Sequence, residues 1–119
     1  MSDHGDSAAI RNYADRFRSA GRRLQAISDD ADAWVYFCTA DWKGQFKDDL
    51  LRLWNENFTA NDALNARAWA DEREAFIKAH PNRARLYDAN VDPGKTAFRT
   101  LIDACNSFAA WLDDYATAI

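Results

Sequence analysis

The 119-residue chain is long enough for one domain with a modest hydrophobic core. Four glycines and two prolines are too few for the many turns of an all-β fold, and sixteen aromatic residues argue against disorder. The net charge of −4 argues against a general nucleic-acid binder, which needs a basic surface. The chain start has no signal-peptide pattern and no segment approaches eighteen apolar residues, so we expect a soluble, cytoplasmic protein without a membrane span.

The first predicted element is one long helix that begins after Asp6 or Ser7, with residues 1–6 frayed. Apolar residues recur at alternating steps of three and four, which is a heptad pattern that places them on one seam. Gly21 and the segment 28–30 are weak points where a second helix could begin, but the unbroken register favours a single helix. The predicted seam consists of Ile10, Tyr13, Phe17, Ala20, Leu24, Ile27, Ala31, Trp34 and Cys38.

The end of this helix, residues 34–38, is apolar on every side and therefore requires cover from several directions. We first expect it to lie in a bundle core. The alternatives are cover by a partner chain or a short β-strand. Two cysteines, Cys38 and Cys105, are too few for a disulfide framework. We expect both to be reduced, buried thiols, and a single disulfide is the alternative.

The segment Trp42-Lys43-Gly44 predicts a turn, and a second helix follows it. Thr59 and Asp62 have the spacing of a capping box, so this helix can break near residues 58–62. His80-Pro81 predicts its end, because the residue before proline is pushed out of the helical conformation. Its heptad positions carry Phe46, Leu50, Leu53, Asn57, Ala60 and Leu64, and this stripe is widened by Trp54, Phe58, Trp69 and Phe76.

Residues 81–92 read as a connection with a short helical turn at 83–88. Asp92-Pro93 then predicts the start of the last helix, with Asp as the cap and Pro in the first turn. The last helix carries Phe98, Leu101, Cys105, Phe108, Leu112, Tyr115 and Ile119 at heptad spacing. The sequence therefore predicts a single all-α domain, residues 1–119. It is an antiparallel helical bundle of three long helices, or four if the middle helix breaks near residues 58–62.

Metal and cofactor chemistry finds little support in the sequence. Neither His4 nor His80 has the Glu-x-x-His spacing of di-iron bundles, and no zinc-type cluster of Cys and His is present. Gly-rich phosphate loops are also absent. We therefore predict no metal site, no cofactor and no catalytic residue.

Arg73 and His80 lie seven residues apart, two helical turns, and so project from nearly the same face. This spacing resembles the active-site motif of HEPN-type RNases, which are also small all-α domains. Glu74 stands where that motif has another polar residue. A small RNase is therefore an alternative function, in which Arg73 and His80 would converge.

Arg11, Arg18 and Arg22 share one face of the first helix. We expect a solvated face whose aliphatic stems shield the seam. The functional alternative is binding to an acidic protein surface or, as the weaker option, to nucleic acid.

The turn Trp42-Lys43-Gly44, between two predicted helices, resembles the signature of the WXG family of small type VII secretion substrates. The resemblance covers residues 8–79 and implies a helical hairpin that dimerises through its long helices. It also implies export without a cleaved signal peptide. The chain departs from the family at Gln45 and Phe46, where a small residue is usual, and in its additional last helix.

The leading hypothesis is a non-catalytic interaction module, such as an adaptor, inhibitor or immunity-type protein. It would bind a protein partner, as a homo- or heterodimer, through an aromatic-rich helical face. The motivation is the absence of a catalytic constellation and the presence of five tryptophans, a residue type enriched in interface hot spots. The candidate partner-binding residues are Trp34, Tyr36, Phe37, Trp42, Trp54, Trp69, Arg11, Arg18 and Arg22.

Overall fold

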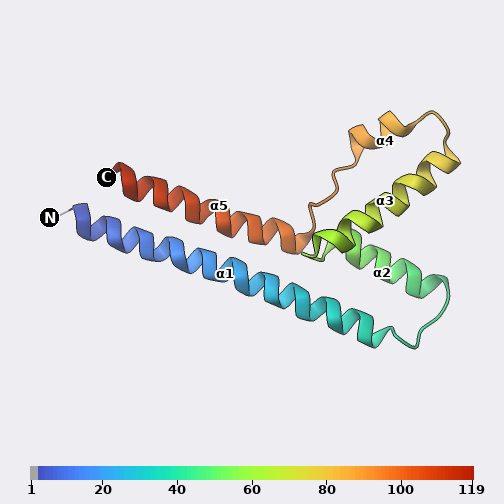
Figure 1. Cartoon of the computed structure of the whole chain (residues 1–119), viewed down its shortest axis with the longest axis horizontal. Helices are drawn as coiled ribbons and strands as arrows, with labels where there is room; N and C mark the ends of the chain where they lie inside the picture. Colours follow the sequence, from blue (N-terminus) through green and yellow to red (C-terminus); the bar gives the residue numbers. More distant parts are fainter. Residues whose placement is uncertain (1–2) are drawn as a thin grey trace. The chain divides into compact units, whose positions relative to one another are not determined.

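The computed structural model describes the backbone of residues 3–119 and the side chains from residue 6 onward. Of the described residues 82% are helical and none lie in a strand, so the predicted all-α class is confirmed. Five helices are present in place of the three or four expected (Figure 1). They are α1 (Asp3–Cys38), α2 (Gln45–Asn57), α3 (Asp62–Ala79), α4 (Ala84–Asn90) and α5 (Ala97–Ala118).

The residue contacts group into two compact units. Unit 1 combines residues up to Ile27 with the segment Thr100–Ile119, and unit 2 contains Ser28–Arg99. Helices α1 and α5 each contribute to both units.

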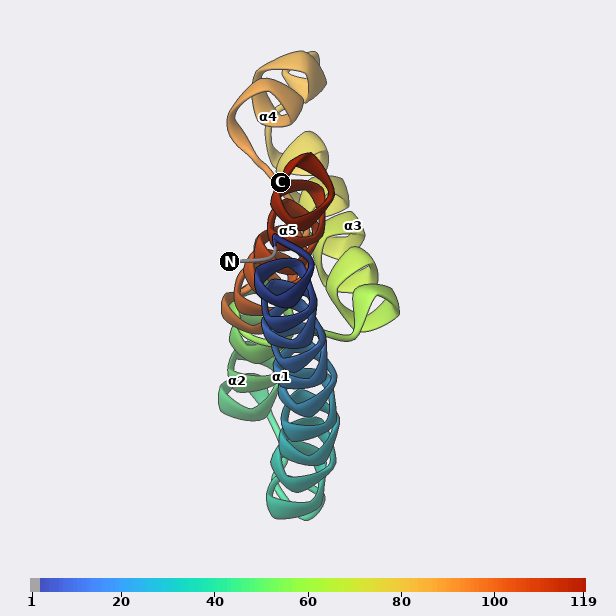
Figure 2. The same ribbon diagram turned by 90° about the vertical axis from the view of Figure 1, so that its left-hand side faces the viewer.

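In unit 1, α1 and α5 lie side by side along their length (Figures 1 and 2). Small residues form their contact: Ala14, Gly21, Ala109 and Ala116 are all buried. A Cβ atom added at Gly21 would lie 3.1 Å from the Asn106 side-chain oxygen, which shows how closely the two helices approach. Small side chains permit this approach because the helix backbones can come near each other without steric conflict.

The contact seam of α1 therefore differs from the predicted one. Tyr13 and Ile27, placed on the seam by the heptad pattern, are each more than half exposed. The buried residues Ala14 and Ser28 follow them directly in the chain. Helix α1 also begins at Asp3, so residues 3–6 are helical, and residues 1–2 lie outside the described residues. Ser7 does not cap α1, because its hydroxyl donates to the Ala116 carbonyl.

Unit 2 contains the end of α1, then α2, α3, α4 and the start of α5. The turn predicted at 42–44 is present, and Gly44 has a φ of 91°, which favours glycine. The middle segment breaks at 58–61, but Asn61 caps α3 by accepting from the Leu64 amide. Thr59 serves a different purpose, described below. Helix α3 ends at Ala79, directly before His80, as the His80-Pro81 pair predicted.

The start of α5 was predicted wrongly at Asp92-Pro93. The helix begins at Ala97, and Thr96 caps it by accepting a hydrogen bond of 3.1 Å from the Arg99 amide. Gly94 precedes this start with a φ of 91°, a left-handed conformation that interrupts any helix running on from Pro93. Asp92 instead pairs with Lys95.

The apolar turn at 34–38 is helical and lies at the surface. Trp34 is 64% exposed and Phe37 is 73% exposed, so neither the bundle-core interpretation nor the β-strand interpretation holds. Cys38, expected to be buried, is exposed, and Cys105 is half-buried; both are free thiols. The rings of Trp34 and Phe37 are therefore not covered by other residues of unit 2.

Candidate functional site

The first aromatic pair of unit 2 lies on the last turns of α1. The rings of Trp34 and Phe37 meet edge to face, with centroids 5.7 Å apart. Together with Ala33 they line a shallow hollow of about 280 Å³. Their spacing of three residues places both on one side of the helix, because a turn takes 3.6 residues. The pair is thus a preformed apolar surface open to solvent.

A second pair lies where α1 gives way to α2. Trp42 and Phe46 have ring centroids 5.7 Å apart and are 43% and 70% exposed. Gly44 lies between them and allows the turn that brings the two rings into contact. We call Trp34, Phe37, Trp42 and Phe46 the aromatic patch.

Tyr36 has a structural contact as well as an exposed ring. Its hydroxyl accepts a hydrogen bond of 2.9 Å from the Asn55 side-chain amide, which ties α1 to α2. The Tyr36 ring is 39% exposed. This bond fixes the end of α1 against α2 and therefore orients the surface that carries Trp34 and Phe37.

Trp54 lies inside unit 2, although it was a candidate contact residue. Its indole N–H donates to the Asp32 carboxylate over 2.6 Å, and its ring stacks on Phe58 with centroids 5.6 Å apart. Thr59 donates to the other Asp32 oxygen over 2.9 Å. Asp32 is buried, so these two donors satisfy a carboxylate that would otherwise be costly to bury. Sequence spacing could not separate this tryptophan from the exposed ones, because the distinction depends on Asp32, 22 residues earlier.

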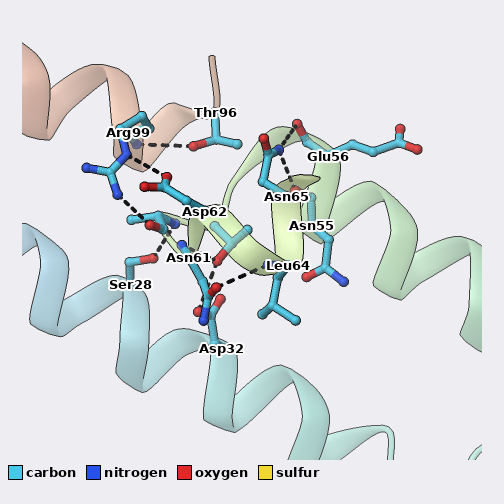
Figure 3. Close-up of polar contacts among 12 residues, drawn as sticks. Ser28, Asp32, Asn55, Glu56, Asn61, Asp62, Leu64, Asn65, Thr96 and Arg99 are labelled. Carbon is cyan, nitrogen blue, oxygen red and sulfur yellow. Dashed lines mark hydrogen bonds and ion pairs between the residues drawn. The ribbon is translucent and has the colours of Figure 1, made fainter. Parts of the chain in front are cut away.

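Beside Asp32, further hydrogen bonds join the turn at 58–61 to α1 and α5 (Figure 3). Ser28 is fully buried and accepts from the Ala60 amide over 2.7 Å. Arg99 donates to the Ala60 carbonyl over 2.6 Å and to Asp62 over 3.1 Å. Figure 3 shows these groups directed toward one another. The cluster satisfies its own donors and acceptors, so its role is to hold unit 2 together.

Trp69 belongs to a second interior region between α3 and α4. With Tyr87 and Val91 it lines a groove of about 500 Å³. The Trp69 indole N–H and the Tyr87 hydroxyl are buried without a hydrogen-bond partner among the described residues. Burial, with the nearby charges of Glu72 and Glu56, raises the pKa of Tyr87. Trp69 is thus a half-buried groove residue and contributes little to the outer surface.

A pair of carboxyl groups is buried near this groove. The Glu56 side chain is 9% exposed and lies 3.7 Å from the Arg52 guanidinium. Burial raises the pKa of Glu56 to about 7, helped by a hydrogen bond to Glu72 and repulsion from its charge, while Arg52 opposes the shift. Two carboxyl groups in contact share one proton more readily than they both ionise.

The arginines named from the sequence have partners within unit 1. Arg18 binds the Asp113 carboxylate across the helix pair and also pairs with Asp15 over 3.1 Å. Arg11 donates to the Thr117 hydroxyl, and Arg22 donates to Ser19. Arg11 and Arg18 therefore contribute to packing α1 against α5.

Arg73 and His80 also have partners of their own. Arg73 forms two hydrogen bonds to Asp88, of 2.8 and 3.1 Å, and the His80 ring packs on Phe76 with centroids 4.9 Å apart. The hydrogen bond to Arg73 lowers the pKa of Asp88, so the pair is ionised at neutral pH. These contacts join α3 to α4.

One exposed group of aromatic residues was not among the candidate binding residues predicted from the sequence. On α5, the ring of Trp111 stacks with those of Phe108 and Tyr115, at centroid distances of 5.9 and 5.7 Å. All three are at least 43% exposed. The signal was present in the sequence: Phe108 and Tyr115 each directly precede an alanine that is buried in the helix contact.

No helix within residues 3–119 is long and apolar enough to cross a membrane. In the same residues no group of three or more His, Cys, Asp or Glu side chains is placed to hold a metal ion. Comparison with known proteins gives no match: no family model, no curated protein and no solved structure is detectably similar to this chain.

Proposed function

We propose that the chain is a non-catalytic interaction module that binds a protein partner through the aromatic patch. The observation that carries the proposal is the exposure of Trp34 and Phe37, 64% and 73%, on a rigid helix. Clustered exposed aromatic residues are unfavourable in water and mark binding sites. Tryptophan is also among the residues most enriched in interface hot spots.

The surroundings of the patch support a preorganised surface. Tyr36 bonds to Asn55, and Asp32 bonds to Trp54, so the end of α1 is held on α2 by two side-chain hydrogen bonds. The aromatic rings of each pair also support each other through ring contacts. A surface that is ordered before binding loses less conformational entropy when the partner arrives.

The test is affinity capture from the source cell with three immobilised chains: the wild type, a Trp34→Ser/Phe37→Ser variant, and Leu86→Ser as the matched control. Leu86 is 52% exposed on α4 and lies outside the patch. We expect the wild type and the control to retain the same stoichiometric protein and the double variant to lose it. Recovery of no stoichiometric partner, or equal recovery by the double variant, would refute the proposal.

A purified partner permits a quantitative measurement. Truncation of two hot-spot aromatic residues costs about 2–4 kcal/mol of binding free energy, which corresponds to a Kd roughly 30- to 1000-fold weaker. Isothermal titration calorimetry measures this change directly. Because Trp34 and Phe37 are exposed, the free energy of unfolding of the variant should stay within about 0.5 kcal/mol of the wild type.

A second candidate is the WXG-type secretion substrate. The observation that favours it is the turn itself, in which Trp42 is exposed beside Gly44 at positive φ between two helices. Export by cells that carry a type VII system would test it, with Trp42→Ala and Gly44→Ala as the variants. No observation favours the RNase alternative, since Arg73 binds Asp88 and His80 packs on Phe76.

A further inference from the structure

Unit 1 has an apolar face that is separate from the aromatic patch. Within its described residues, 3–27 and 100–119, unit 1 consists of α1 and α5 alone. Apart from the buried Ile102, the buried apolar side chains of these two helices are small, and most of their large apolar side chains are left at the surface. These side chains are 37–58% exposed, and we call them the hairpin face: Tyr13, Phe17 and Ile27 on α1, and Leu101, Phe108, Trp111 and Tyr115 on α5.

The residues of the hairpin face lie on the same side of the helix pair. In both helices an exposed apolar residue directly precedes a buried one, as in Tyr13-Ala14 and Phe108-Ala109. The same offset on two antiparallel helices directs both stripes to one side of the contact. The ring contact between Phe17 and Phe108, with centroids 4.7 Å apart, joins the two stripes directly.

This face has the layered pattern of half a four-helix bundle. Ile10 and Leu24 lie seven residues on either side of Phe17, and Tyr115 and Leu101 lie seven residues on either side of Phe108. The antiparallel pairing therefore sets three apolar layers about 10 Å apart, with one residue from each helix in each layer. Two more helices with the same spacing would complete every layer.

The charges of unit 1 indicate what supplies those helices. The α1 part of unit 1, residues 3–27, carries five arginines and three aspartates. The α5 part, residues 100–119, carries three aspartates and neither lysine nor arginine. One helix is thus basic and the other acidic. Arg18 and Asp113 already pair within one copy. A two-fold axis along the helices would bring each α1 onto the α5 of the other copy, which places the remaining charges of opposite sign together. That arrangement is isologous and complementary in charge.

We propose that a second copy of this chain covers the hairpin face, so that two α1–α5 pairs form an antiparallel four-helix bundle. Seven side chains, each about half exposed, offer roughly 700 Å² per copy if a large side chain presents about 200 Å² in full. A stable interface buries about 800 Å² per partner, so the apolar face and its polar edge supply the area required. The proposal does not depend on the aromatic patch.

Arg16 and Asp114 flank the hairpin face and set the charge contact between copies. The Arg16 guanidinium lies over the Tyr13 ring, 5.4 Å from its centroid, at the outer edge of α1. Asp114 is exposed and directly precedes Tyr115 on α5. In the two-fold arrangement, Arg16 of one copy and Asp114 of the other lie along the same edge, offset by about 7 Å along the helix axis, a distance that the long arginine side chain can span. Stacking α1 on α1 would instead bring arginine toward arginine.

Sedimentation equilibrium of the full chain under reducing conditions tests the proposal, at concentrations up to about 50 µM, well above a micromolar Kd. We expect the wild type to have twice the chain mass of 13.5 kDa. Phe108→Glu should give a monomer that keeps its helical circular dichroism, and Phe37→Glu, on unit 2, should leave the dimer intact. A wild-type monomer, alone or while binding an unrelated protein, overturns the proposal, as does a dimer that Phe108→Glu does not weaken.

A charge exchange tests the arrangement without altering the apolar face. Arg16→Asp and Asp114→Arg should each weaken the dimer about tenfold, and the double variant should restore wild-type affinity. Both side chains are exposed, so we expect all three variants to remain folded. A double variant as weak as the sum of its parts would contradict the stacking of α1 on α5.

Discussion

Substituting Glu56 by glutamine should make unit 2 more stable at alkaline pH and change little in acid. In the folded chain the pKa of Glu56 is raised to about 7 by burial and by the adjacent Glu72, whereas its ordinary value is 4.5. Between these values the folded state holds a proton that the unfolded state has released. The free energy of unfolding therefore falls as the pH rises from about 4.5 to 7. Above that range the contribution of the protonated Glu56 side chain to stability is fully lost.

The size of the effect on the free energy of unfolding follows from the shift in the pKa of Glu56. A carboxyl group whose pKa rises from 4.5 to about 7 loses about 3 kcal/mol of stabilisation across that range. Glutamine has the shape of the protonated acid and cannot ionise, and its amide can donate to the Glu72 carboxylate. At about pH 8 Glu56→Gln should therefore exceed the wild type by about 2–3 kcal/mol in free energy of unfolding.

Urea denaturation followed by circular dichroism, repeated at several pH values, gives this difference directly. Other groups also titrate, so the informative quantity is the difference between variant and wild type as a function of pH. Glu74→Gln provides the matched control, because Glu74 is exposed on the same helix as Glu72, and its difference should stay flat. A Glu56→Gln difference that does not change with pH, or that is destabilising at pH 8, would refute the reasoning.

Three further substitutions test the packing described above, each by urea denaturation. Gly21→Ala should stabilise unit 1 by up to about 1 kcal/mol, since the exposed Asn106 side chain can move from its 3.1 Å approach, whereas Gly21→Leu should disrupt the helix contact. Asp32→Ala should cost about 3 kcal/mol, because it leaves the Trp54 and Thr59 donors buried without an acceptor. Thr96→Ala should cost about 1 kcal/mol through loss of the α5 cap. An Asp32→Ala chain as stable as the wild type would contradict the structural role of the polar cluster.

Several features of the fold could be predicted because they depend on local chemistry. The turn at Gly44, the end of α3 before Pro81 and the short helix after it each follow from the backbone preferences of a few adjacent residues. The break at 58–61 was also visible, although Asn61 and not Thr59 caps the next helix. Thr59 is a residue type that can cap a helix, but in the folded chain its hydroxyl donates to the Asp32 carboxylate.

The helix contact could not be predicted in the same way. Apolar periodicity located the stripe containing Tyr13 and Phe17, but both residues are exposed in the structure, and the small residues beside this stripe are buried against α5. Hydrophobic patterning identifies a face that avoids water, and it does not say whether the cover comes from the same chain. The informative signal was side-chain size: Ala14, Gly21 and Ser28 recur every seven residues beside the aromatic stripe.

Likewise, whether a candidate binding residue is buried or exposed depends on contacts with residues that are distant in the sequence. Trp34, Phe37 and Trp42 are at the surface, while Trp54 is held inside by Asp32. All four are large aromatic residues in or beside predicted helices, and composition and spacing alone could not tell which of them are buried.

The close approach at Gly21 has a consequence for how α1 tolerates change. One edge of the helix, at Ala14, Gly21 and Ser28, is limited by volume, whereas the adjacent edge, at Tyr13 and Ile27, is limited by hydrophobicity. A saturation mutagenesis screen for folding should therefore yield two distinct sequence profiles on a single helix. At Ala14 and Gly21 the first edge accepts serine, alanine and glycine and rejects every large residue, while position 28 retains serine because its hydroxyl accepts from the buried Ala60 amide. The second edge accepts large apolar residues. Adjacent positions of α1 would thus be selected for different properties, side-chain volume at one and hydrophobicity at the next.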